Sequence, residues 1–172
     1  MRKFTLAAVF ALSGCAGIPE GIEPVDKFEL EPYLGTWYEI ARLDHRFERG
    51  LSNVTAKYTL REDGGVSVLN RGYRAKKDKW DEAEGKAYFV GDPGVGQLKV
   101  SFFGPFYGAY NVFELGENYE YSMVAGANRS YLWILARKAQ LSQSMLDELL
   151  AKAEAAGYDT SELIFVEHDR AP

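Results

Sequence analysis

The 172-residue sequence has few of the residues on which several classes of protein depend. It contains one cysteine, which excludes a disulfide within the chain, and two histidines, which form no evident Cys/His cluster for zinc. Acidic residues outnumber basic residues by 25 to 20, which argues against nucleic acid as the main partner, because that binding depends on neutralising phosphates. No apolar run after residue 15 approaches the length of a membrane-spanning helix. We therefore expect one domain with its own core and no metal or other cofactor.

The N-terminus carries a short targeting pattern. Arg2 and Lys3 precede an apolar stretch over residues 4–12, which is too short to span a bilayer. The following Leu-Ser-Gly-Cys ends at Cys15 and resembles a bacterial lipoprotein signal, which implies cleavage before Cys15 and acylation of its thiol. An ordinary signal peptide with an incidental cysteine, or an uncleaved anchor, is the alternative. Ala16 and Gly17 after the cysteine resemble outer-membrane sorting, which implies a lipid-anchored protein in the envelope of a Gram-negative bacterium.

Three regions follow from this pattern. Residues 1–14 are the predicted signal peptide, and removing them changes the formal net charge from −5 to −7, since Arg2 and Lys3 leave with it. Residues 15–25 contain two glycines and two prolines without periodicity, which predicts a lipidated tether. Residues 26–172 form the predicted domain.

Most of this domain is predicted to be β-structure. Eight runs rich in aromatic and β-branched residues are separated by turn residues, among them the Asp63-Gly64 step, which favours a hairpin. The predicted strands are 37–42, 53–60, 66–73, 84–90, 97–103, 109–115, 119–125 and 131–137, with a short final strand at 163–166. Short connections favour an up-and-down antiparallel order, and eight such strands can close into a barrel without exposed edges. The expected fold is all-β.

One helix is predicted after the strands. Residues 143–155 place Met145, Leu149 and Ala153 at helical spacing, with Ser142 as the N-cap and Gly157 as the C-terminal stop. Because the polar face of this helix is acidic rather than basic, we expect its apolar face to pack on the outside of the barrel instead of on a membrane.

Two separated motifs resemble those of the lipocalin family. Gly35-Thr36-Trp37 opens the first strand and resembles the family's G-x-W signature, and Arg137 resembles its late basic residue. The resemblance covers residues 26–166. The signal and the stretches 34–50 and 99–113 are similar to the bacterial outer-membrane branch of the family, which is related to apolipoprotein D. The resemblance implies a lipocalin barrel in which the Arg137 guanidinium lies over the Trp37 indole at the closed end. The family's Thr-Asp-Tyr is not kept, since residues 116–119 read Gly-Glu-Asn-Tyr.

Strand alternation predicts which side chains face the barrel interior. When Trp37 is set inward, the two-residue period gives a mostly apolar set in which small residues favour a cavity. The predicted ligand-binding residues are Ala56, Tyr58, Val68, Asn70, Ala87, Val100, Phe102, Tyr110, Val124, Tyr131 and Trp133. Plain core packing is the alternative role for each aromatic residue.

The open end of the barrel is predicted to be basic. The loops after strands one, three, five and seven share that end and carry eight basic and three acidic residues. The predicted rim residues are Arg42, Phe47, Lys76, Lys77, Trp80 and Arg129. A basic rim around an apolar interior favours amphiphiles with an anionic head. Solvated loop charge is the alternative.

These features predict a membrane-anchored lipocalin that stores or transports fatty acids or lysophospholipids. The alternatives are a carrier of another hydrophobic molecule and a structural or interaction lipoprotein without a ligand, and an aromatic mouth also permits a homodimer. No enzymatic activity is expected, because His45 has no evident nucleophile fixed beside it and no glycine-rich phosphate loop follows a strand.

Overall fold

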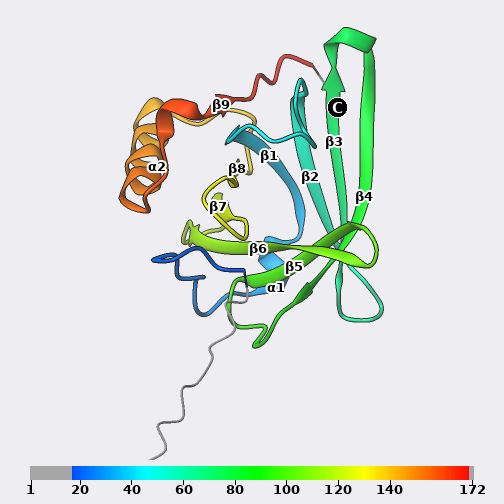
Figure 1. Cartoon of the computed structure of the whole chain (residues 1–172), viewed down its shortest axis with the longest axis vertical. Helices are drawn as coiled ribbons and strands as arrows, with labels where there is room; N and C mark the ends of the chain where they lie inside the picture. Colours follow the sequence, from blue (N-terminus) through cyan, green and yellow to red (C-terminus); the bar gives the residue numbers. More distant parts are fainter. Residues whose placement is uncertain (1–16, 171–172) are drawn as a thin grey trace, which may run out of the picture.

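A closed antiparallel barrel forms the body of the protein (Figure 1). The computed structural model describes residues 17–170, so the predicted signal peptide and Cys15 lie outside the described residues. The strands are β1 (Gly35–Arg42), β2 (Ser52–Leu60), β3 (Val66–Arg74), β4 (Lys79–Phe89), β5 (Gln97–Phe103), β6 (Phe106–Leu115), β7 (Tyr121–Ala125), β8 (Leu132–Ala136) and β9 (Ile164–Phe165). Consecutive strands pair from β1 to β8, and β1 also pairs with β8, which closes the barrel. The predicted fold class is confirmed.

The strands follow the predicted alternation, with differences at their ends. The β2–β3 hairpin turns at Gly64, whose φ of 80° suits glycine, and the Asp63 carboxylate accepts a hydrogen bond from Gly65 N–H at 3.0 Å. β4 begins at Lys79, five residues earlier than predicted, because its charged first half pairs with β3 along its full length. The β3–β4 hairpin consequently rises beyond the rest of the barrel (Figure 1).

The helix α2 (Gln143–Ala155) packs on the outside of the barrel, as predicted (Figure 1). Ser142 Oγ accepts a hydrogen bond from Met145 N–H at 3.3 Å, and Gly157 has a φ of 84° just beyond the helix. Leu149 and Ala153 are fully buried in a cluster with outward-facing side chains of β7 and β8. This outer core is separate from a second core inside the barrel.

Two short helical turns and one helix complete the described elements. They are α1 (Leu30–Tyr33), η1 (Ala75–Lys77) at the β3–β4 turn and η2 (Thr160–Glu162) after α2. The short helix α1 was not predicted from the sequence, and it carries buried Tyr33 into the inner core at the closed end of the barrel. Within residues 17–170, no helix is long and apolar enough to cross a membrane.

The predicted tether is wrong for residues 17–25, because this segment packs against the barrel. Val25 N–H donates to the Val112 carbonyl, and the Val25 carbonyl accepts from Gly96 N–H, both at 2.8 Å. Ile22 is 6% exposed and belongs to the outer core. The prolines and glycines that suggested a spacer instead shape a segment that turns at Pro19–Ile22 and meets β6 near both of its ends, at Gly17 and Val25 (Figure 1).

Candidate functional site

The base of the barrel is closed by Trp37 and Arg137. Trp37 is fully buried, and the Arg137 guanidinium carbon lies 3.8 Å from the centre of its ring. Arg137 also donates to the carbonyls of Pro32 at 2.6 Å and Thr36 at 2.9 Å, so the guanidinium ties α1 to the start of β1. This is the arrangement that the resemblance implied, and it suits arginine because a planar head can cover an indole while donating at its edge.

Above this base, three tyrosines and a serine join their hydroxyl groups. Tyr33 Oη lies 2.8 Å from Tyr110 Oη and 2.9 Å from Ser122 Oγ, and Tyr58 Oη lies 2.9 Å from Tyr110 Oη. Burial raises the pKa of Tyr33 to about 12 and also raises the pKa of Tyr58, so these hydroxyls stay protonated. The Tyr110 hydroxyl is therefore hydrogen-bonded to both Tyr33 and Tyr58.

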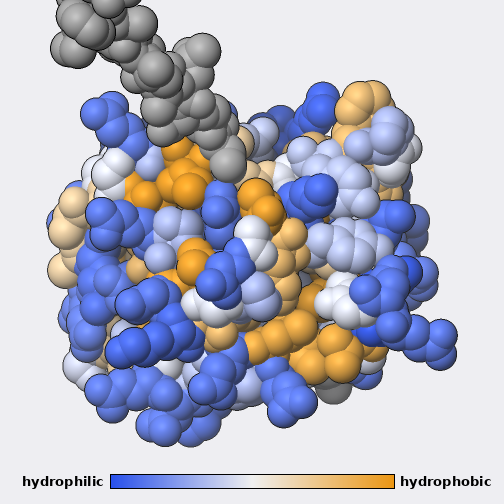
Figure 2. Space-filling view, turned by 90° about the horizontal axis from the view of Figure 1, so that it is seen from below, coloured by the Kyte–Doolittle hydropathy of each residue, from blue (hydrophilic) through white to orange (hydrophobic). Residues whose placement is uncertain are grey.

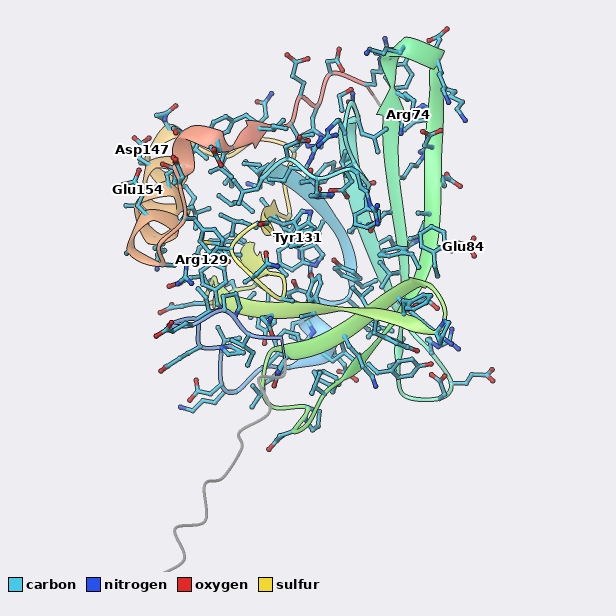
Figure 3. The ribbon with its side chains drawn as sticks, viewed as in Figure 1. Arg74, Glu84, Arg129, Tyr131, Asp147 and Glu154 are labelled. Carbon is cyan, nitrogen blue, oxygen red and sulfur yellow. The ribbon has the colours of Figure 1, made fainter. Side chains whose placement is uncertain are left out.

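The predicted inward set converges inside the barrel. Nine of its members belong to the same cluster as Trp37: Ala56, Tyr58, Val68, Ala87, Val100, Phe102, Tyr110, Val124 and Trp133. Asn70 is the partner of Ala56 across the β2–β3 ladder, and Tyr131 stacks on Trp133 with ring centres 6.0 Å apart. Figure 3 shows Tyr131 within the ring of strands. The structure thus brings all eleven residues to the interior.

Exposure of these side chains varies with their place in the barrel. Val68, Ala87 and Val124 are buried, whereas Ala56, Val100, Phe102, Tyr110, Tyr131 and Trp133 keep intermediate exposure although they face inward. Part of the inward face is therefore accessible. Gly85 adds no open room on this face, because a Cβ there would lie 2.8 Å from the Phe102 ring. Phe102 therefore occupies the room that the small residues of β4 leave.

A buried ionic cluster lies at the open end of this interior. Arg42 Nη1 donates to Glu39 Oε1 at 2.6 Å, and Arg42 Nη2 donates to the Glu48 carbonyl at 2.9 Å. Glu48 Oε2 accepts from Trp133 Nε1 at 3.1 Å and lies 2.9 Å from His45 Nε2. All four residues are less than 9% exposed. The cluster pins the β1–β2 loop and one edge of Trp133 to the barrel wall.

The two carboxyl groups of this cluster have opposite pKa shifts. Burial, with the charge of Glu48 adding to it, raises the pKa of Glu39 well above its ordinary range, although Arg42 opposes this. Burial also acts to raise the pKa of Glu48, but hydrogen bonding and charge attraction from His45, together with Trp133 and Arg42, outweigh burial and lower it. The pair therefore favours a proton on Glu39 and a negative charge on Glu48.

The prediction of Arg42 as a rim residue is wrong, and a β-bulge is the reason. Alternation from Trp37 makes Glu39 and Ala41 inward and Arg42 outward. The register shifts between Glu39 and Ala41, which turns Arg42 inward opposite Trp133. Arg42 is 1% exposed and does not contribute charge to the surface. Sequence reasoning also missed Glu39 and Glu48 in this cluster, although Glu39 on an inward face was a signal that a buried partner was needed.

The other predicted rim residues have different surroundings. Lys76 and Lys77 lie exposed in η1, and Phe47 is 57% exposed on the β1–β2 loop. Trp80 lies at the open end but on the outer face, where it faces Tyr73 and the Arg71 guanidinium 4.1 Å from its ring centre.

Arg129 does not serve the rim. It donates to the carbonyls of Glu20 at 2.6 Å and Ala156 at 3.1 Å, between the N-terminal segment and α2 (Figure 3).

The basic rim is therefore smaller than predicted. Arg49 pairs with Asp44 at 2.6 Å, and Asp81 pairs with both Lys79 and Arg74. Among the predicted rim charges, Arg46, Lys76 and Lys77 are exposed and form no ion pair within the described part of the chain. Of the eight basic residues predicted for the rim, three thus remain exposed and without an ion pair among the described residues.

The rest of the described surface offers no better candidate for a binding site. A hollow of about 530 Å³ lies outside the closed end, beside Phe28, Leu30, Phe89 and Pro93. Figure 2, which shows the molecule from below, shows apolar patches interrupting a largely hydrophilic surface on that side. No group of His, Cys, Asp and Glu side chains in residues 17–170 is arranged to hold a metal ion. The interior remains the candidate site.

Comparison with known proteins agrees with this architecture. Residues 28–168 match the family of lipocalin-like domains. The chain therefore belongs to the lipocalin family.

Sequence relatives indicate which kind of lipocalin this chain is. The chain is 56% identical over 165 residues to the outer membrane lipoprotein Blc of Vibrio cholerae, covering 95% of this chain and 96% of the relative. It is 51% identical to the protein of that name from Escherichia coli K12, over 93% and 92% of the two chains. Apolipoprotein D of Macaca fascicularis is 31% identical over 97% and 96%. The chain is thus a lipocalin of the outer membrane lipoprotein type.

Solved structures share the fold. Insecticyanin from Manduca sexta superposes with a TM-score of 0.70 at 20% identity, covering 88% of this chain and 86% of that chain.

Proposed function

We propose that this lipocalin holds fatty acids or lysophospholipids inside its barrel and is kept at the membrane by acylation of Cys15. The observation that carries the proposal is the interior itself, where apolar side chains from all eight strands converge and several of them, among them Ala56, Val100 and Trp133, stay partly accessible. Burial contributes about 0.8 kcal/mol per methylene, so ten methylenes give about 8 kcal/mol before the cost of ordering the ligand. An acyl chain is therefore sufficient for binding.

The polar groups of the barrel favour a ligand whose head stays outside. The tyrosine hydroxyls at the base pair with each other, and the ionic cluster is sealed, so neither supports a buried head group. Arg46, Lys76 and Lys77 lie around the open end, where a carboxylate or phosphate would meet them. This arrangement supports a single-chain amphiphile whose tail enters first.

The proposal includes no catalysis. His45 is 6% exposed, lies beside Glu48 and is packed against Trp133, with ring centres 5.1 Å apart. Among the described residues, neither ring nitrogen of His45 is hydrogen-bonded to a hydroxyl or thiol that it could activate. A carrier of another hydrophobic molecule and a ligand-free structural lipoprotein are the alternatives that the experiment must separate.

The test is to fill the interior and measure binding. The mature lipoprotein is delipidated, mixed with palmitic acid or palmitoyl lysophospholipid, and examined by native mass spectrometry. Ala56→Trp places an indole among the inward side chains, and Val100→Trp does so from another strand. Lys57→Trp, on the exposed face of the same strand as Ala56, is the control.

We expect both inward variants to bind at least about tenfold less lipid and Lys57→Trp to bind as the parent does. Unchanged binding by inward variants that retain the parent's melting temperature would contradict an interior site. Absence of lipid on the parent protein would favour the ligand-free alternative.

A further inference from the structure

The tip of the β5–β6 hairpin is an exposed aromatic surface. Phe103 is 71% exposed, Phe106 is 79% exposed and Tyr107 is 40% exposed. We call these three residues the hairpin tip. Phe103 and Phe106 are partners across the ladder, so their side chains stand together. Residues 100–113 contain no charged side chain, whereas the chain as a whole is 26% charged. A cluster of exposed aromatic residues in an uncharged stretch marks a contact surface.

The N-terminal segment begins, at Gly17, against the same hairpin. Asn111 Nδ2 on β6 donates to the Gly17 carbonyl at 2.9 Å. A Cβ at Gly17 would lie 3.1 Å from Ala109 Cβ, also on β6. Cys15 precedes Gly17 by two residues, which span at most about 7 Å. Ala109 follows Phe106 by three residues, about 10 Å along a strand. The chain therefore keeps Cys15 within on the order of 20 Å of the hairpin tip.

The segment cannot carry the anchor elsewhere, because it is held along its length. Arg129 binds the Glu20 carbonyl at 2.6 Å, Ile22 is buried, and Val25 is hydrogen-bonded between Val112 and Gly96. A free spacer of this length would allow the barrel any orientation. A packed segment instead fixes which face of the barrel is nearest to acyl chains on Cys15.

We propose that the hairpin tip docks on the lipid bilayer and, with the acylated Cys15, turns the open end of the barrel toward the membrane. In an up-and-down barrel, the β5–β6 turn lies at the same end as the β1–β2 and β3–β4 connections. Phenylalanine and tyrosine suit the interface between acyl chains and head groups, and the Lys99 ammonium lies 5.0 Å from the Tyr107 ring centre, where it can reach head groups. The inference rests on the proposed function only for the acylation of Cys15.

The occupant is a bilayer rather than a second copy of the chain because of where the anchor lies. The tip is within on the order of 20 Å of the site from which the acyl chains would extend, so bound protein keeps the tip near the membrane surface. The mature chain has a formal charge of −7, so docking must depend on apolar burial rather than on attraction to anionic lipids.

The test measures how deep the tip lies. Mature acylated protein is reconstituted into phosphatidylcholine vesicles with or without brominated acyl chains, which quench tryptophan on contact. Phe106→Trp reports from the hairpin tip. Leu60→Trp is the matched control, because Leu60 is a 54% exposed apolar residue at the opposite end of the barrel. We expect the tryptophan at position 106 to be quenched at least about twofold more than the one at position 60. Equal quenching would overturn the proposal.

A second variant separates docking from ligand binding. Phe103→Ser combined with Phe106→Ser should slow transfer of a fluorescent fatty acid from vesicles into the barrel, while binding of palmitic acid in vesicle-free solution stays unchanged. If the parent protein binds no palmitic acid in solution, the proposed function is wrong. The quenching of the tryptophan at position 106 would still test membrane docking by itself. If the parent is a dimer that these substitutions separate, and position 106 is quenched no more than position 60, the tip is a subunit interface and the docking proposal is wrong.

Discussion

The buried Arg42–Glu39 pair provides the sharpest test of the interior described above. Arg42 is 1% exposed and Glu39 is 3% exposed, and Arg42 also donates to the Glu48 and Leu51 carbonyls at 2.9 and 3.3 Å. Arg42→Ala removes these contacts and leaves two buried carboxyl groups, Glu39 and the negatively charged Glu48, without the guanidinium charge that stabilises both. Breaking a buried pair from one side lowers the free energy of unfolding by about 3–5 kcal/mol, and we expect a loss of that size at neutral pH.

The free energy of unfolding lost on Arg42→Ala should depend on pH, and the pKa shift of Glu39 determines the direction. The pKa of Glu39 is raised in the folded protein, so the folded state holds a proton that the unfolded state releases as pH rises. Stability linked to Glu39 therefore falls as pH rises above the ordinary glutamate range. Without Arg42 the pKa of Glu39 rises further, so the deficit of Arg42→Ala should be larger at pH 8 than at pH 5.

The assay is guanidinium unfolding followed by tryptophan fluorescence at both pH values. Arg49→Ala is the matched control, because Arg49 pairs with Asp44 at the same 2.6 Å but both side chains are exposed, and such pairs contribute little. Glu39→Leu combined with Arg42→Met should recover most of the loss, since an apolar pair leaves no buried charge. A small, pH-independent effect of Arg42→Ala, equal to that of Arg49→Ala, would refute the reasoning.

Two further predictions concern the ends of the barrel. Arg137→Lys should lower the free energy of unfolding by about 1–3 kcal/mol, because an ammonium cannot cover the Trp37 ring and reach the Pro32 and Thr36 carbonyls together; unchanged thermal unfolding would contradict this role. Lys76→Glu combined with Lys77→Glu should weaken binding of palmitic acid at low salt by several-fold and leave binding of a neutral monoglyceride unchanged. Equal effects on both ligands in a binding titration would show that the rim charges do not select the head group.

The sequence was sufficient for the features that depend on local pattern. Alternation of apolar residues predicted the strands, because an inward and an outward face impose a two-residue period. The helix followed from its own spacing and from Ser142 and Gly157, which act within one turn of its ends. The inward set around Trp37 followed because alternation carries from one fixed residue along each strand and across each hairpin.

Only the tertiary structure decided the features that depend on contacts between distant segments. The bulge between Glu39 and Ala41 arises from pairing with β8, and it placed Arg42 inside, where alternation placed it outside. Residues 17–25 read as a spacer because their partners, Gly96, Asn111, Val112 and Arg129, lie far along the chain. Local patterns record what one segment favours by itself, whereas register and packing depend on which distant residues the closed barrel brings beside it.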